Sequence, residues 1–257
     1  MADRDSVLHG APCWVDLWTS DVEGSRNFYS QVFDWVANEP NPEFGGYFMF
    51  TKNEVPIAGA MGDMGDMKAN NTWKGYLSVS DISNTLELVK ANGGTIMGEA
   101  NVIADLGTQC VILDPSGATI GIWQADNFSG FMQVNEHGAP SWFELFAKNY
   151  EIGIEFYTKC FGWSLNTVSD TDEFRYSVFM GPDGKEDLIG VMDASSIIPE
   201  ADSSFWSIYW EVDSVDEACK IISTLGGQIF DGPADTPYGR IASVADPSGA
   251  KFKLRKG

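Results

Sequence analysis

The stretch His9-Gly-Ala-Pro-Cys-Trp-Val-Asp-Leu17 occurs a second time, with few changes, as His137-Gly-Ala-Pro-Ser-Trp-Phe-Glu-Leu145. The two copies are 128 residues apart (137 − 9 = 128) in a chain of 257 residues. A repeat of this period indicates a duplicated structural unit and dictates the architecture. We therefore expect two homologous domains, each about half of the chain.

Further pairs of similar segments follow in the same order in both halves. They are Phe28-Tyr29 with Trp35 against Phe156-Tyr157 with Trp163, Gly93-Gly94 against Gly226-Gly227, and Asp114-Pro-Ser-Gly-Ala118 against Asp246-Pro-Ser-Gly-Ala250. The offset drifts from 128 to 132 (246 − 114 = 132), as a few loop insertions would produce. Asp-Pro-Ser-Gly is a tight-turn sequence, so each copy predicts a β-hairpin.

Each half divides again into two units with the same pattern. A short strand pattern that ends in Asp or Asn occurs at 14–21, 73–81, 142–149 and 206–213. A helical pattern follows each strand, with Asp21 or Ser20 as the cap of the first helix and Asp81 or Ser83 as the cap of the second. Short β-rich runs come after each helix. The chain thus predicts four modules of strand, helix and three strands, in the α+β class.

Composition restricts the possible partners. The formal net charge is −21, with 37 acidic and 16 Lys or Arg residues. Binding to nucleic acid or to an anionic membrane surface needs a basic footprint, so we expect neither partner. Hydrophobic residues make up 44% of the chain and aromatic residues 13%, enough for a core in each half.

The four cysteines show no C-x-x-C spacing, which predicts reduced thiols. No apolar run has the length of a membrane span, and the N-terminal residues lack the apolar region of a signal peptide. We therefore expect a cytoplasmic protein.

These motifs together resemble the vicinal oxygen chelate superfamily, which includes glyoxalase I, extradiol dioxygenases and bleomycin-resistance proteins. The resemblance is to its tandem-domain branch, labelled glyoxalase-like or hydroxylase-like. It implies four βαβββ modules forming two tandem glyoxalase-like domains, in which curved mixed sheets enclose cavities. The expected boundaries are 8–124 for the first domain, 125–137 for a linker and 138–257 for the second domain.

In that superfamily the cavity holds a divalent metal bound by His, Glu or Gln side chains. The resemblance implies ligand positions at Trp14, Lys74, Trp142, Trp206, Gly121 and Lys253, with the remaining positions in 57–61 and 188–192. Trp and Gly side chains do not ligate metals, and an ammonium group is a poor ligand. His9 and His137 each precede a Gly-Ala-Pro turn, where we expect a turn role. We therefore predict no bound metal and no other cofactor.

Alternate residues of a strand point to the same face. The predicted cavity-facing set consists of the acids Asp16 and Glu144, as tentative catalytic residues, and the ligand-binding residues Trp14, Trp18, Lys74, Tyr76, Trp123, Trp142, Trp206 and Lys253. A carboxyl in an aromatic pocket could act as a general acid or base. Two other interpretations stay open: internal ion pairs (Asp16 with Lys74, Glu144 with Lys253), and tryptophans that plug a former metal site.

The favoured function is a metal-independent, glyoxalase-like protein that binds a small aromatic or apolar metabolite. One alternative is a cofactor-free hydroxylase-like or isomerase enzyme that uses a cavity carboxylate. Another is a drug-sequestering resistance protein, whose acidity would help to capture a cationic drug. A metal-dependent glyoxalase or dioxygenase is the least favoured. The expected partner is a small molecule, with the chain as a monomer or a homodimer.

Overall fold

The computed structural model describes residues 7–180 and 187–257. In the first half the elements are β1 (Pro12–Trp18), α1 (Val22–Phe33), β2 (Val36–Ala37), a 3-10 turn (Pro42–Phe44), β3 (Phe48–Lys52), β4 (Val55–Met61), β5 (Thr72–Ser78), α2 (Ile82–Ala91), β6 (Thr95–Ile96), β7 (Asn101–Ile103), β8 (Gly107–Leu113) and β9 (Thr119–Ala125). In the second half they are β10 (Pro140–Ala147), α3 (Tyr150–Phe161), β11 (Ser164–Asp170), β12 (Arg175–Met180), β13 (Asp187–Asp193), β14 (Phe205–Glu211), α4 (Val215–Thr224), β15 (Gln228–Thr236), β16 (Gly239–Ala245) and β17 (Lys251–Lys256). The repeated order confirms the four modules and the α+β class.

Each half of the chain builds one mixed sheet. The first has the strand order β2-β3-β4-β1-β5-β9-β8-β6, with β7 beside β8, and the second has the order β11-β12-β13-β10-β14-β17-β16-β15. The first strands of the two modules in a half pair antiparallel at the centre of its sheet, as β1 with β5 and β10 with β14. Both sheets have the strand order expected of a duplicated unit.

The helices begin where the sequence places their caps. Asp21, Asp81 and Asn149 each accept a hydrogen bond from the backbone N–H three residues ahead, at 2.9, 2.9 and 3.2 Å. In the fourth module Ser214 is the cap and accepts from the N–H of Glu217 at 3.3 Å. A capping oxygen satisfies a donor that the first helical turn leaves unpaired, and this fixes the start of each helix.

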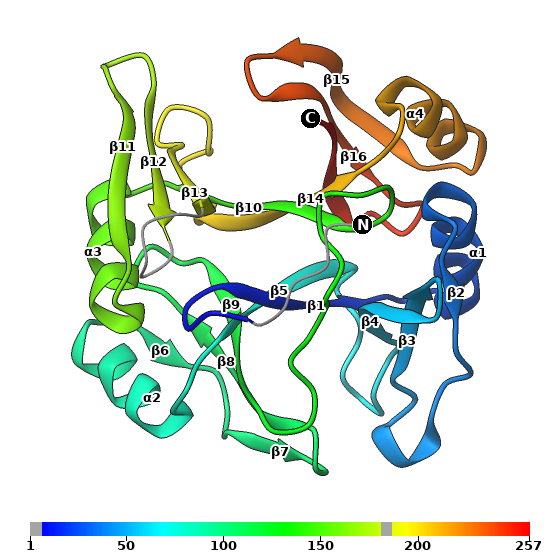
Figure 1. Ribbon diagram of the computed structural model, residues 1–257, viewed down its shortest axis with the longest axis horizontal. Helices are drawn as coiled ribbons and strands as arrows, with labels where there is room; N and C mark the ends of the chain where they lie inside the picture. The colour runs from blue at the N-terminus through cyan, green and yellow to red at the C-terminus, as the bar shows by residue number, and fades with distance from the viewer. Residues whose placement is uncertain (1–6, 181–186) are drawn as a thin grey trace.

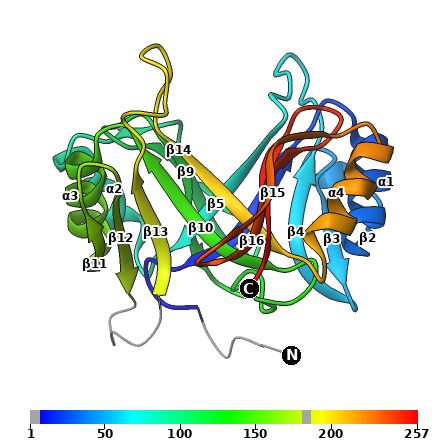
Figure 2. The same cartoon turned by 90° about the horizontal axis from the view of Figure 1, so that it is seen from above.

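The two sheets lie back to back, with their central strands facing each other across the middle of the molecule (Figure 1). Helices α1 and α4 pack at one side of this sandwich, and α2 and α3 pack at the other (Figure 2). One buried cluster runs through both halves: Trp210 of β14 lies 4.9 Å from Trp35 and 5.4 Å from Trp73, ring centre to ring centre. The two domains therefore share a single core.

The segment between β9 and β10, which we expected as a linker, packs against both domains. The backbone N–H of Phe131 donates to the Cys13 carbonyl at 2.9 Å, and its ring stacks on Phe143 at 6.0 Å. The Phe128 ring contacts Trp14 edge to face at 4.8 Å. This connection therefore contacts the cores of both domains.

All four cysteines are buried, and none of them forms a disulfide bond. Within residues 7–180 and 187–257, no helix combines the length and the apolar character needed to cross a bilayer.

Candidate functional site

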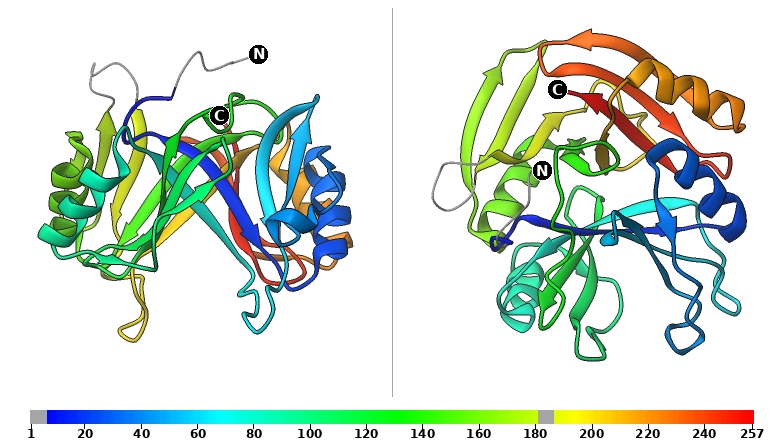
Figure 3. Two further views of the ribbon diagram at one scale, coloured as in Figure 1. Left: turned by 90° about the horizontal axis from the view of Figure 1, so that it is seen from below. Right: turned by 45° about the vertical axis from the view of Figure 1, so that its right-hand side comes forward.

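A cavity of about 560 Å³ lies on the concave side of the first sheet. Figure 3 (left) views the molecule from this side; the lining residues come from β1, β3, β4, β5, β7, β8 and β9 and from the loops beside them. The wall is largely apolar and aromatic, with contributions from Trp14, Phe44, Phe48, Leu106, Trp123 and Phe128. Small-molecule sites have volumes in the range of about 300–1,000 Å³ and this kind of lining. The cavity is thus suited to one small organic molecule.

The carboxyl of Asp16 lines this cavity and accepts several hydrogen bonds. The Tyr47 hydroxyl donates to its Oδ1 at 2.8 Å, and the Trp14 indole N–H donates to the same oxygen at 2.9 Å. The indole N–H also lies 2.9 Å from the Tyr47 oxygen, and the Tyr76 hydroxyl bonds to the carboxyl as well. Two strands, β1 and β5, and the loop before β3 therefore meet at one carboxyl.

Burial raises the pKa of Asp16, although the hydrogen bonds from Tyr47, Tyr76 and Trp14 and the charge of Lys74 act in the opposite direction. Lys74 is directly opposite Asp16 on the neighbouring strand β5. Burial lowers the pKa of this lysine, and the charge of Asp16 opposes that change. Among the residues that the structure describes, no ion pair within 4.0 Å joins the two groups, so the proposed salt bridge is a longer-range interaction.

Gln109 of β8 brings a second polar group to the cavity wall. Its side-chain oxygen is buried and has no hydrogen-bond partner within the described part of the chain. Leaving a buried acceptor unpaired costs about 1–3 kcal/mol. A bound molecule that offers an N–H or O–H group here would remove this penalty.

The second domain repeats the polar cluster with a glutamate. The Tyr209 hydroxyl donates to Glu144 Oε2 at 2.5 Å, and the Tyr176 hydroxyl also bonds to this carboxyl. The Trp142 indole N–H donates to the Tyr176 oxygen at 3.1 Å. One acid, two tyrosines and one tryptophan thus occupy equivalent places in both domains.

Of the predicted site residues, Trp14, Asp16, Tyr76 and Trp123 do line the cavity of the first domain. Trp18 is half-buried and donates to the Gly62 carbonyl at 2.8 Å, beyond the cavity lining. Lys74 is on the same sheet face as Asp16 but is not part of the lining. In the second domain, Lys253 is paired with Tyr209 across neighbouring strands.

Trp206 is on the opposite face of its sheet from the predicted position. Its indole donates to the Tyr157 hydroxyl of α3 at 3.0 Å, as Trp73 does to Tyr29 of α1 at 2.9 Å. Ser207, and not Trp206, is the strand partner of Glu144, in the place that Lys74 has opposite Asp16. The prediction for Trp206 was therefore one residue out of register.

The sequence argument missed Tyr47, Gln109 and Phe128 in the first cavity, and Tyr176 and Tyr209 in the second domain. Tyr47 and Tyr176 come from the hairpins after the helices, whose register the sequence leaves open. The position of Tyr209 could have been predicted, because it is two residues after Ser207 on β14 and therefore points to the same face of the sheet. His9 and His137 have the expected turn role, because their Nδ1 atoms accept from the backbone N–H of Ser80 and Asp213.

The residues at the ligand positions implied by the superfamily do not fit a divalent ion. A β-carbon on Gly59, which is opposite Asp16 on β4, would lie 1.8 Å from the Tyr47 oxygen. One on Gly121 would lie 2.1 Å from the Tyr76 ring. Tyrosine side chains thus fill the space that ligands from these positions would need. The described residues include no cluster of three His, Cys, Asp or Glu side chains arranged to hold a metal ion.

Known proteins resemble this chain along its whole length. The putative glyoxylase CFP32 of Mycobacterium tuberculosis (strain CDC 1551 / Oshkosh) is 32% identical over 262 residues, which span 100% of this chain and 98% of that protein. The anthracycline biosynthesis protein DnrV of Streptomyces peucetius is 27% identical over 96% of this chain and 94% of its own length.

Solved structures share the fold. The Mn(II)-bound glyoxalase from Novosphingobium aromaticivorans superposes with a TM-score of 0.65 at 15% identity, covering 97% of this chain and 82% of that one. The 2,3-dioxygenase LapB from Pseudomonas sp. KL28 gives 0.63 at 18% identity, covering 98% and 93%. The sequence profile of the Glyoxalase/Bleomycin resistance protein/Dioxygenase superfamily matches residues 12–122 and 139–254. The chain therefore belongs to this superfamily.

Proposed function

We propose that the first domain binds a flat, largely apolar organic molecule without the help of a divalent metal. One observation carries the proposal: an open aromatic cavity remains where Trp14, Tyr47 and Tyr76 gather around Asp16 in place of metal ligands. The apolar wall would enclose the ring system of the ligand. The polar edge of the ligand would donate to Gln109 or to Asp16. The names of DnrV and DauV refer to anthracycline biosynthesis, and a polycyclic aromatic compound is of the class that this wall suits.

Ligand binding can be followed by tryptophan fluorescence, because Trp14 and Trp123 line the cavity. A panel of hydroxylated naphthalenes and anthraquinones is expected to quench the emission and to raise the melting temperature, since a ligand of the folded state stabilises it by RT ln(1 + [L]/Kd). The variant Gln109→Leu removes the unpaired acceptor and should weaken binding of hydroxylated ligands about tenfold. Gln228→Leu, an exposed change on β15, is the matched control.

Metal analysis tests the other half of the proposal. The purified protein is expected to contain no stoichiometric Mn, Fe, Ni or Zn, and ligand binding should survive treatment with EDTA. A stoichiometric metal whose removal abolishes ligand binding would overturn the proposal and favour chelate chemistry.

A second candidate is a cofactor-free enzyme that uses Asp16 as an acid or base. The raised pKa of this carboxyl, caused by burial, favours it, because acids and bases near neutrality transfer protons best. The variant Asp16→Asn separates the candidates. An enzyme should lose turnover and keep its affinity for the substrate, whereas a protein that sequesters a cationic drug should lose affinity for the cation.

A further inference from the structure

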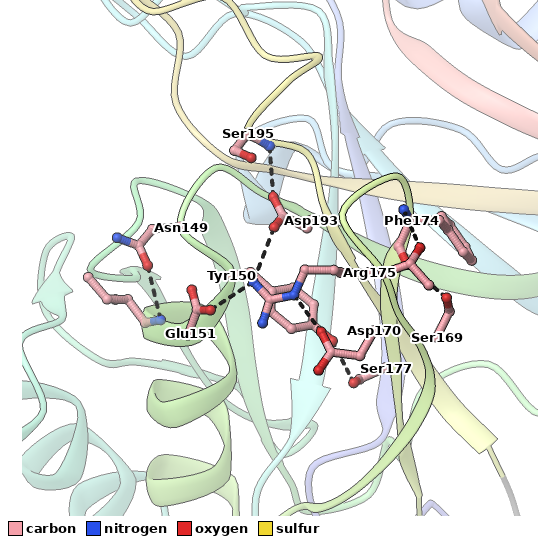
Figure 4. A network of polar contacts seen from close by, with 12 residues as sticks. Asn149, Tyr150, Glu151, Ser169, Asp170, Phe174, Arg175, Ser177, Asp193 and Ser195 are labelled. Atoms are coloured by element: carbon pink, nitrogen blue, oxygen red, sulfur yellow. Dashed lines mark hydrogen bonds and ion pairs between the residues drawn. The ribbon is translucent and has the colours of Figure 1, made fainter.

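Most cations of the second domain are held by acceptors of the protein. Arg175 makes ion pairs with Glu151, Asp170 and Asp193 at 2.7, 2.8 and 3.4 Å, and lies over the Tyr150 ring (Figure 4). Arg240 pairs in the same manner with Asp216 and Asp235. These groups stabilise the protein and have few donors left for a ligand.

The cations on one face of β17 are different. Lys251, Lys253 and Arg255 alternate along this strand, so they share a face of the sheet. None of the three makes an ion pair within 4.0 Å among residues 7–180 and 187–257. Arg255 donates to the Tyr238 carbonyl at 3.0 Å, and Lys251 lies over the Phe230 ring at 5.2 Å. A row of unpaired cations is unexpected in a chain with a net charge of −21.

Lys253 is at the centre of this row and is half-buried. Its ammonium lies 4.8 Å from the centre of the Phe146 ring and 5.2 Å from that of Tyr209. Burial lowers the pKa of Lys253, while Glu144 and Asp231 act in the opposite direction. Glu144 already accepts from Tyr209 and Tyr176. The three N–H groups of Lys253 have no hydrogen-bond acceptor in the described part of the protein.

The first domain has a glycine at the position of Lys253, and its own half-buried lysine, Lys74, lies on β5 opposite Asp16 instead. Gly121 pairs with Tyr76 in the first sheet, as Lys253 pairs with Tyr209 in the second. The Tyr76 ring fills the space that a side chain at position 121 would need. Both sheets therefore carry an acid and a half-buried lysine, and the lysine of the second sheet lies on β17 beside the rings of Phe146 and Tyr209.

Two further tyrosines of the second sheet contact each other across it. Tyr176 of β12 stacks on Tyr238 of the β15–β16 turn at 6.3 Å, although β12 and β15 are near opposite ends of the strand order. The sheet must curve to allow this contact, and Figure 2 shows β12 and β13 on one side of the central strands β10 and β14, with β15 and β16 on the other. A ring system bound on this concave face would lie beside tyrosine rings, with Lys253 at its edge.

We propose that the concave face of the second sheet is a separate binding site for an aromatic carboxylate. The carboxylate accepts hydrogen bonds from the ammonium of Lys253, and Arg255 and Lys251 add attraction at longer range. The ring packs against Tyr209 and the Tyr176–Tyr238 pair. This site is independent of the cavity of the first domain and of the ligand proposed for it.

Titration calorimetry with 2-naphthoate at low ionic strength tests the site in the full-length protein. One molecule is expected to bind, more weakly as salt is added, and the neutral amide 2-naphthamide should bind at least tenfold less tightly. Lys253→Gln should weaken 2-naphthoate binding about tenfold or more, as expected for loss of a charge-assisted hydrogen bond. Lys253→Arg keeps the charge and should restore most of the affinity.

Lys256→Gln is the matched control, because it removes one charge from the same strand at a residue paired with Glu211 at 3.7 Å. An equal loss of affinity in this variant would reduce the effect to net charge and overturn the proposal. Unchanged affinity in a folded Lys253→Gln protein would overturn it too. Gln109→Leu should leave 2-naphthoate binding intact, and a loss there would assign the anion to the first cavity instead.

Discussion

The hydroxyl of Tyr29, on a helix of the first domain, donates a 3.0 Å hydrogen bond to the carboxyl of Asp246 in a turn of the second. The reverse contact is also present, because Tyr157 of the second domain donates to Asp114 of the first at 3.0 Å. Each tyrosine also accepts from a tryptophan of its own sheet. The two Asp-Pro-Ser-Gly turns thus serve as hairpins and as acceptors for the other domain.

Removing one of these hydroxyls should destabilise the whole protein. Tyr29→Phe removes one donor from the buried carboxyl of Asp246, which keeps the backbone N–H of Ala250, and leaves the Trp73 N–H without its acceptor. We expect a loss of about 1–3 kcal/mol in the free energy of unfolding, measured by urea denaturation. Tyr238→Phe, at an exposed ring, should change stability by less than about 0.5 kcal/mol. Equal effects from the two variants would contradict this account.

The shared core predicts a single unfolding transition. Trp210 packs against Trp35 and Trp73 across the domain boundary, so neither half keeps its core alone. Calorimetry should give equal van't Hoff and calorimetric enthalpies, as for one cooperative unit. Two resolved transitions, or a folded fragment ending at residue 124, would show that the domains are independent.

Asp16 should make stability depend on pH in a defined direction. Its folded-state pKa is raised by burial, so the folded protein binds a proton before the unfolded chain does as the pH falls. The slope of unfolding free energy with pH is then negative for this group, and its charged form costs stability at neutral pH. Relative to Asp16→Asn, the wild type should gain stability as the pH falls from 7 to about 4. Urea denaturation across this range measures the difference in unfolding free energy between the two proteins. The contributions of the other acids are common to both and cancel. A constant difference would contradict the raised pKa.

Two glycine-to-alanine changes should have opposite effects. At Gly59 the new methyl group would lie 1.8 Å from the Tyr47 oxygen, so Gly59→Ala should destabilise by about 1–3 kcal/mol through overpacking. At Gly153, within α3, the nearest atoms are at 3.4 and 3.6 Å, and alanine favours the helix by about 0.5–1 kcal/mol. Thermal denaturation of both variants checks the pair. A neutral Gly59→Ala would mean that the tyrosine moves freely and that the space is available to a ligand side chain.

The sequence predicted the modules and the helix starts because these depend on local signals, such as Asp21 and Asp81 as caps and the Asp-Pro-Ser-Gly turns. The error at Trp206 has a local cause as well. The sequence pattern ends this strand at Asp213, whereas Ser214 caps the helix; the pattern is therefore shifted by one residue, and Ser207 is the strand partner of Glu144.

Other features of the site depend on contacts between distant segments. Tyr47 reaches Asp16 only because β3 and β4 form a hairpin that pairs with β1, and no local pattern encodes that register. Phe128 belongs to the segment that the sequence predicts as a linker, but its ring contacts Trp14. Cavity walls made by such segments need the fold before they can be identified.

Because the two sheets turn their convex faces to each other, their hollows open on opposite sides of the molecule (Figure 1). The buried core that includes Trp35, Trp73 and Trp210 lies between them. The two concave faces can therefore diverge in sequence and in ligand, while the shared core stabilises both domains.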